Sequence, residues 1–277
     1  MNGVDGNERV ARRDELLEQI AHTGDLSEIN VTIPGTGTVL RVTRPTNTDL
    51  LLDQIADDPE QNLPYWAEIW PSGVALGAAV AAHPEPVTGA RVLELGSGIG
   101  ITAALALAAG ADVIATDYAP ESLVLTRLTC LDHAGREPET MQVNWRDPAH
   151  QERLAQHGPY PVVLAADVLY EARDIEPLLE LANRIVTPGG LLWLAHPGRP
   201  PARAFLERAR EMGWRGTATE YAGPWPDSDD ALVIVFVHAL RRPGQIAEIA
   251  IDKPRTGMPK TTQQIIKRRD LRARDHR

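Results

Sequence analysis

From Pro71 onward the chain alternates short apolar runs with longer stretches that have helical periodicity. The apolar runs are 91–95, 112–116, 141–145, 162–166 and 191–195, and helices are expected at 72–82, 101–109, 122–133, 174–186 and 202–212. Short apolar strands connected by helices are typical of parallel sheets that are buried on both faces. The alternation therefore predicts an α/β fold, with a mostly parallel sheet and helices on both of its faces.

The last two apolar runs break this alternation. Residues 214–220 and 231–238 both have the composition of strands, and no helical stretch separates them. Consecutive strands pair as an antiparallel hairpin, which would add one reversed strand to the sheet. We therefore expect a Rossmann-like sheet of seven strands rather than a fully parallel dinucleotide-binding sheet.

A small cap is predicted ahead of this sheet. Residues 10–21 have the apolar spacing of a short amphipathic helix, and a second short helix is expected at 49–55. Two β-branched runs, 29–33 and 38–42, flank a turn rich in Pro and Gly, which predicts a β-hairpin. We expect these elements to cover the main domain rather than to fold independently.

Charge is distributed unevenly along the chain. The net charge is −10, yet residues 241–277 contain eleven Lys or Arg and only four Asp or Glu. Such a segment favours a disordered basic tail. We therefore divide the chain into a cap (1–62), an α/β domain (63–240) and the tail (241–277). The acidic body argues against a nucleic-acid partner, because phosphate binding needs a clustered basic face.

Several classes of protein are disfavoured by what the sequence lacks. No apolar stretch reaches the roughly 18 residues of a membrane span, and the first residues do not resemble a secretory signal. Cys130 is the single cysteine, and the eight histidines show no metal-ligand spacing. We expect a cytoplasmic, monomeric protein without a membrane association or a bound metal.

The most informative motif is the glycine-rich loop Glu94-Leu95-Gly96-Ser97-Gly98-Ile99-Gly100, between a predicted strand and a predicted helix. Glycines allow a tight turn and let a ligand approach the backbone, and the helix N-terminus offers free N–H groups. Glu94 can accept from an ammonium group, and Asp117, at the end of the next strand, can accept both hydroxyls of a ribose. Together these features predict a site for a nucleoside that carries an amino-acid group.

This loop resembles the first motif of class I S-adenosylmethionine-dependent methyltransferases in its G-x-G-x-G form. Leu63-Pro64-Tyr65-Trp66-Ala67-Glu68-Ile69-Trp70-Pro71-Ser72-Gly73 is similar to the segment that precedes this domain in the protein-lysine methyltransferase group. That group includes the enzymes that act on the electron-transfer flavoprotein β subunit, and relatives labelled nicotinamide-N-methyltransferase-like. Asp167-Val168-Leu169-Tyr170 matches the group's acidic-x-x-aromatic motif. The resemblance covers about residues 29–240 and implies S-adenosylmethionine as the cofactor.

The resemblance also implies roles for the matching residues. Asp167 and Tyr170 would act at the acceptor entrance, Asp167 by orienting an incoming ammonium and Tyr170 by a π face or a hydroxyl contact. Many relatives carry an acid near Trp145 to read the adenine; here the nearest residues are Asn144 and Asp147, and the choice between them is open. The expected donor-binding residues are Trp70, Gly73, Glu94, Gly96, Ser97, Gly98, Gly100, Asp117, Asn144, Trp145 and Asp167.

The sequence leaves the methyl acceptor open. The leading interpretation is transfer to an amine, on the lysine side chain of a protein, and the alternative within the class is a small-molecule N-methyltransferase. A nicotinamide-dependent oxidoreductase fits less well, because of the acid in the first strand and the final strand pair. A binding protein that kept the fold and lost the chemistry is disfavoured by the intact Glu94, Asp117 and Asp167.

Overall fold

The computed structural model describes residues 6–47, 51–52, 63–226 and 233–244. Internal contacts divide the chain into two units, 1–244 and 245–277, and the second unit lies outside the described residues. The expected helix at 49–55 lies mostly outside them as well, and so does most of the expected tail.

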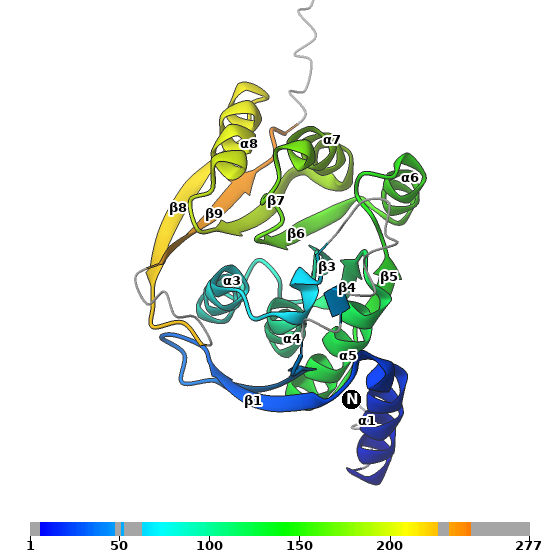
Figure 1. Cartoon of the computed structure of the whole chain (residues 1–277). Coiled ribbons are helices and arrows are strands. Elements are labelled where there is room, and N and C mark those ends of the chain that lie inside the picture. The colour runs from blue at the N-terminus through cyan, green and yellow to red at the C-terminus, as the bar shows by residue number, and fades with distance from the viewer. Residues whose placement is uncertain (1–5, 48–50, 53–62, 227–232, 245–277) are drawn as a thin grey trace, which may run out of the picture. The chain divides into compact units, whose positions relative to one another are not determined.

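Seven strands form one sheet in the order β5-β4-β3-β6-β7-β9-β8 (Figure 1). Strand β9 is antiparallel to both β7 and β8, and the other neighbours are parallel. This confirms the predicted Rossmann-like, mostly parallel sheet with a reversed strand from the final hairpin. The strands are β3 (Arg91–Leu95), β4 (Asp112–Asp117), β5 (Glu139–Gln142), β6 (Tyr160–Ala166), β7 (Val186–His196), β8 (Arg215–Ala222) and β9 (Ile234–Arg241).

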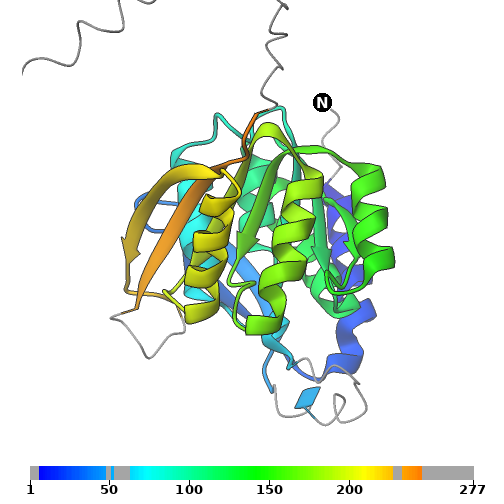
Figure 2. The same ribbon diagram turned by 90° about the horizontal axis from the view of Figure 1, so that it is seen from above.

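Helices cover both faces of the sheet, as predicted (Figures 1 and 2). One face carries α3 (Pro71–Ala82), α4 (Ile101–Ala108) and α5 (Pro120–Ala134), and the other carries α6 (Pro148–His157), α7 (Ile175–Ile185) and α8 (Pro200–Glu211). Successive residues of a strand point to opposite faces. Val92 therefore packs in the core on the α3–α5 side, and Leu93 in the core on the α6–α8 side.

The predicted N-terminal helix and hairpin are also present. They are α1 (Gly6–Ile20), followed by a 3₁₀ turn at Ala21–Thr23, and the antiparallel pair β1 (Leu26–Thr32) and β2 (Val39–Pro45). The hairpin buries Val31 and Leu40 completely, in the same core as helices α3 and α4. Arg13 on α1 and Arg41 on β2 both pair with Asp132 on α5, which ties the cap to the domain.

Some expected boundaries are wrong. The third strand was expected at 141–145, but β5 ends at Gln142, so Trp145 lies in the connection that follows it. Helix α6 was not predicted; it begins after Asp147, whose side chain accepts a hydrogen bond from the Ala149 amide at 2.8 Å. This is an ordinary N-cap, and the proline after it fits the first helical position. Strand β7 begins at Val186, ahead of the expected start, and spans the Pro-Gly-Gly sequence.

Gly100 gives a stability test of this packing. Its φ is +83°, and a Cβ there would lie 2.6 Å from the Thr126 Cα on α5, whereas Gly89 has φ +70° and open space around it. We expect Gly89→Ala to cost about 1 kcal/mol from the left-handed backbone alone. Gly100→Ala should cost about 3 kcal/mol, because overpacking adds to the same term.

Urea denaturation of both variants measures the difference. Equal losses of unfolding free energy in the two variants would contradict the close α4–α5 contact at Gly100.

Candidate functional site

A cavity of about 440 Å³ lies beyond the carboxyl ends of β3, β4 and β6. Strand β3 pairs with both β4 and β6, so the strand order reverses at this position. Ligands of open α/β sheets bind at such a switch point. Seven of the predicted residues line the cavity, namely Trp70, Gly96, Gly98, Asp117, Trp145, Asp167 and Tyr170. The predicted residues that do not line it are Gly73, Glu94, Ser97, Gly100 and Asn144.

The glycine loop turns from β3 into α4 with all three glycines in the left-handed region. Gly96 and Gly98 face the cavity, and the Gly98 amide donates to Asp117 Oδ2 at 3.0 Å. Ser97 instead holds the loop in place, since its amide donates to the Thr116 carbonyl and its hydroxyl accepts from Thr126. The loop therefore offers two glycines to a ligand, while Ser97 and Gly100 serve its own structure.

Asp117 is a buried carboxylate, only 4% exposed, at the end of β4. Its two oxygens accept from the Gly98 amide at 3.0 Å and the Ala119 amide at 3.2 Å. Burial raises the pKa of Asp117, and the hydrogen bonds from the backbone amides oppose that rise. A carboxylate has about four lone-pair positions, so the group retains acceptor capacity for two hydroxyls of a ligand.

Glu94 lies in β3, is 2% exposed and does not line the cavity. Its Oε2 atom is buried and has no hydrogen-bond partner among the residues that the structure describes. Burial raises the pKa of Glu94 to about 8, and the nearby Asp117 carboxylate adds to the rise. Leaving a buried acceptor unsatisfied is costly, so this oxygen fits a role that is completed by a bound cation or a water molecule.

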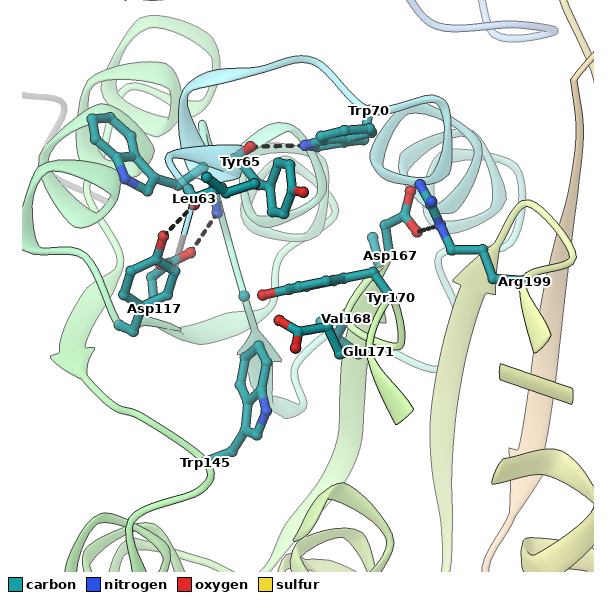
Figure 3. A pocket seen from close by; sticks show the side chains of 15 residues that line it. Leu63, Tyr65, Trp70, Asp117, Trp145, Asp167, Val168, Tyr170, Glu171 and Arg199 are labelled. Atoms are coloured by element: carbon teal, nitrogen blue, oxygen red, sulfur yellow. Dashed lines mark hydrogen bonds and ion pairs between the residues drawn. The ribbon is translucent and has the colours of Figure 1, made fainter. Parts of the chain in front are cut away.

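An aromatic wall closes one side of the cavity (Figure 3). The Tyr65 ring stands edge-to-face against Trp70 at 5.7 Å and against Tyr170 at 5.3 Å between ring centres. The Trp70 indole donates to the Tyr65 carbonyl at 2.7 Å, and the Tyr118 hydroxyl donates to the Leu63 carbonyl at 2.8 Å. These bonds fix the segment before α3, which includes a 3₁₀ turn at Tyr65–Ala67, over the cavity.

Asp167 follows β6 with a φ of +56°, a left-handed conformation that is uncommon for aspartate. Its Oδ1 accepts from Arg199 Nε at 3.1 Å, and its Oδ2 accepts from the Ser72 hydroxyl at 3.2 Å. Burial raises the pKa of Asp167, and the Arg199 charge opposes the rise. Burial also raises the pKa of Tyr170 to about 12, so that hydroxyl keeps its proton at neutral pH.

Trp145 is held from behind by a carboxylate that sequence reasoning missed. Asp174, fully buried at the end of a 3₁₀ turn (Ala172–Asp174), accepts from the Trp145 indole at 2.9 Å and from Arg146 Nε at 2.7 Å. A Cβ on Gly96 would lie 3.6 Å from the Trp145 ring, so the indole forms a wall beside the glycine loop. Asn144 lines a smaller adjoining cavity with Trp145, while Asp147 is used as the α6 cap.

Gly73 lies in the first turn of α3, where an added Cβ would meet nothing within 4 Å. Packing therefore gives no reason for glycine at this position. Its carbonyl accepts from the Thr102 hydroxyl of α4 at 3.2 Å, which places it beside the helix that follows the glycine loop.

Eight residues that line the cavity were not predicted. Tyr65 and Trp66 belong to the motif at residues 63–73, in which only Trp70 and Gly73 were predicted to bind a ligand. Arg199 lies three residues after β7, at the same sheet edge as Asp117 and Asp167, and that position was the one available signal. The unpredicted lining residues are Leu63, Tyr65, Trp66, Tyr118, Ala166, Val168, Glu171 and Arg199.

The described residues also bear on metal binding and on membrane spanning. Within the described ranges, no three His, Cys, Asp or Glu side chains are arranged to hold a metal ion. None of the described helices combines the length and the apolar character needed to cross a bilayer.

A family model described as lysine methyltransferase matches residues 54–211, which is more than half of the chain. The chain belongs to the lysine methyltransferase family. The matched residues include the segment before α3 with its aromatic side chains, the glycine loop, and the cavity-lining residues between Asp117 and Arg199. The resemblance inferred from the sequence motifs is thereby confirmed.

Individual relatives match this lysine methyltransferase family member over shorter stretches. The electron transfer flavoprotein beta subunit lysine methyltransferase of Mus musculus is 32% identical over 139 residues, which are 50% of this chain and 52% of the mouse protein. A histone-arginine methyltransferase of Xenopus laevis is 30% identical over 120 residues, 43% of this chain and 50% of that protein. The chain thus spans about half the length of these curated relatives.

Among solved structures, the T. thermophilus 16S rRNA N2 G1207 methyltransferase, in complex with AdoMet and guanosine, is similar in fold. The TM-score is 0.54 over 79% of this chain and 51% of that chain, at 14% sequence identity. A likeness at this identity supports the fold alone.

The raised pKa of Glu94 predicts a pH-dependent stability difference. In the folded protein the pKa of Glu94 is about 8, against an ordinary value of 4.5. The wild type therefore loses stability as the pH rises between these values, because the unfolded chain releases this proton more readily. Glu94→Gln has no proton to exchange. We therefore expect this variant to be more stable than the wild type, by a margin of a few kcal/mol that grows from pH 4.5 to pH 8 and then levels off.

Urea denaturation at a series of pH values measures this margin, and Glu85→Gln, the same change at an exposed position, provides the baseline. A margin that does not vary with pH would contradict the buried, neutral carboxyl group.

Proposed function

We propose that this family member is an S-adenosylmethionine-dependent methyltransferase that transfers a methyl group to an amine, on the lysine side chain of a protein. The observation that carries the proposal is one cavity with two unlike sides. The glycine loop and Asp117 form one side, and the aromatic wall with Asp167 forms the other. The division into a cap (1–62), a catalytic domain (63–240) and a basic tail (241–277) is part of the same proposal.

On the donor side, the residues supply a complementary group for each part of S-adenosylmethionine. Glu94 would accept from its ammonium, directly or through a water molecule, which the orphaned Oε2 supports, and Asp117 would accept from its ribose hydroxyls. Gly96 and Gly98 would let it approach the backbone, with Ser97 and Gly100 holding the loop. Trp70, Gly73, Asn144 and Trp145 complete the proposed set, with Asn144 favoured over Asp147 at the adenine because Asp147 caps α6.

When bound, the donor supplies a methyl group on a sulfonium that is already activated for displacement. The chain's own task is then to align a neutral amine and to exclude water. Tyr65, Trp70 and Tyr170 suit the long apolar stem and the cationic head of lysine. The Tyr170 hydroxyl stays protonated, so it can orient the amine but does not take its proton at neutral pH.

Asp167 and Tyr170 are the two residues that we propose to contact the incoming amine. Both of its oxygens already have a partner, Arg199 and Ser72, so the carboxylate is fixed in position before an acceptor arrives. This supports an orienting role for Asp167. A carboxylate that is already fixed can hold the amine in a reactive geometry at a smaller cost in entropy.

A small-molecule amine is the second candidate acceptor. It is favoured by the way in which the segment of Leu63, Tyr65 and Trp70 is bonded over the cavity, because a covered cavity suits a ligand that enters whole.

A cytoplasmic location and a monomeric state are proposed from the sequence alone.

Incubation of the purified protein with methyl-labelled S-adenosylmethionine and a cell lysate tests the acceptor class. We expect label in the protein fraction, recovered as methyl-lysine after hydrolysis. Label in the metabolite fraction alone would indicate the small-molecule alternative. No transfer to either fraction would contradict the proposal and favour a binding protein.

Asp117→Ala should weaken the binding of S-adenosylmethionine by about a hundredfold, because two hydrogen bonds to a charged acceptor are lost together. Calorimetric titration measures the dissociation constant. Asp112→Ala, at the exposed opposite end of β4, is the matched control. Asp117→Asn keeps an acceptor for the Gly98 amide and separates loop support from ligand contact. An unchanged dissociation constant in Asp117→Ala would remove this residue from the site.

A further inference from the structure

Arg199 enters the cavity from the loop after β7 and makes two contacts there (Figure 3). Its Nε atom donates to Asp167 Oδ1 at 3.1 Å. Its guanidinium carbon lies 5.9 Å from the centre of the Trp70 ring, within the range of a cation–π contact. The Asp167 side chain is 8% exposed and the Arg199 side chain 38% exposed, so the pair connects the buried end of the cavity to its rim.

These contacts use only one of the donors of Arg199. A guanidinium has five N–H donors, and the four on the two Nη atoms form the fork that matches a carboxylate. In the part of the chain that the structure describes, neither Nη atom of Arg199 donates a hydrogen bond. The side chain is therefore held in one orientation by Asp167 and Trp70 while its fork stays available at the cavity.

The other charged groups of the cavity are already engaged. Glu171 pairs with Arg173 at 2.6 Å, and the Asp117 oxygens accept from backbone amides. In the adjoining smaller cavity, Arg146 pairs with Asp174 at 2.7 Å. An anionic ligand group would therefore meet its best partner at Arg199, where a positive charge and several N–H donors coincide.

We propose that Arg199 is a carboxylate-binding residue of this cavity, which receives the ligand's carboxylate on its two Nη atoms. This inference rests on the proposed function, under which two bound groups can supply a carboxylate. One is the amino-acid end of the methyl donor, and the other is an acidic residue beside the acceptor lysine. In either case Asp167 is a positioning residue for Arg199 in addition to its proposed role toward the amine.

The first arm of the test compares two donor-side ligands. S-adenosylhomocysteine has the amino-acid carboxylate and methylthioadenosine lacks the whole amino-acid end. If the donor supplies the carboxylate, Arg199→Gln should weaken the binding of S-adenosylhomocysteine by about tenfold or more. The affinity for methylthioadenosine should stay unchanged. Calorimetric titration gives both dissociation constants.

The second arm compares two acceptor-side ligands on the protein saturated with S-adenosylhomocysteine. The probes are two short lysine peptides that differ only in an Asp or an Asn next to the lysine. If the acceptor supplies the carboxylate, the wild type should bind the Asp peptide about tenfold more tightly, and Arg199→Gln should abolish this preference. Tryptophan fluorescence reports binding, since Trp66, Trp70 and Trp145 line the cavity.

Two further variants separate recognition from folding. Arg199→Lys keeps a positive charge beside Asp167 but lacks the planar fork, so it should retain most of the thermal stability and lose most of the carboxylate preference. Arg210→Gln makes the same charge change at an exposed position on α8, away from the cavity, and should match the wild type in both arms.

The outcomes distinguish this inference from the function on which it rests. If Arg199→Gln loses affinity only for the ligand that has the carboxylate, in either arm, the role of Arg199 is supported. The arm in which the loss occurs identifies the source of the carboxylate. Wild-type affinity and selectivity in both arms of Arg199→Gln would overturn it and leave the proposed function intact. Failure of the wild type to bind S-adenosylhomocysteine would instead overturn the proposed function, and this inference with it.

Discussion

The cavity depends on the hydrogen bond between the Gly98 amide and the Asp117 carboxylate, which joins the turn after β3 to the end of β4. The turn is possible because the glycines at 96, 98 and 100 adopt left-handed conformations that cost other residues about 1–2 kcal/mol each. The bond also orients Asp117, so a single contact arranges both the backbone and the acid that face a ligand. The proposed donor side is thus a consequence of strand pairing between β3 and β4.

Burial of carboxyl groups is the cost of this arrangement. Glu94, Asp117 and Asp167 all have raised pKa values, with desolvation as the first cause. Asp117 and Asp167 are compensated by amides, Ser72 and Arg199, whereas Glu94 keeps one oxygen without a partner in the described residues. A ligand that carries an ammonium group would relieve this penalty, so its binding free energy would include a contribution that the free protein lacks.

The sequence was informative for most of the features that a local rule decides. Strand and helix periodicity predicted the seven-stranded sheet, and the acid-flanked glycines predicted the loop that lines the cavity. The start of α6 was missed although Asp147 and Pro148 form an ordinary N-cap and first position. Arg199 and Asp174 were not predictable by such rules, because their partners Asp167 and Trp145 lie 32 and 29 residues away along the chain. Contacts of this kind are set by the strand order rather than by local pattern.

The pairing of Asp167 with Arg199 alters the electrostatics of the proposed acceptor side. An isolated buried carboxylate would attract an ammonium strongly but would hold it in the charged form, which cannot attack a methyl group. A carboxylate that is already paired with a guanidinium presents little net charge, so it can orient an amine without favouring protonation as strongly. The neighbouring positive charge of Arg199 further disfavours the protonated amine. The ion pair therefore fits a site whose ligand must arrive as a cation and react as a neutral base.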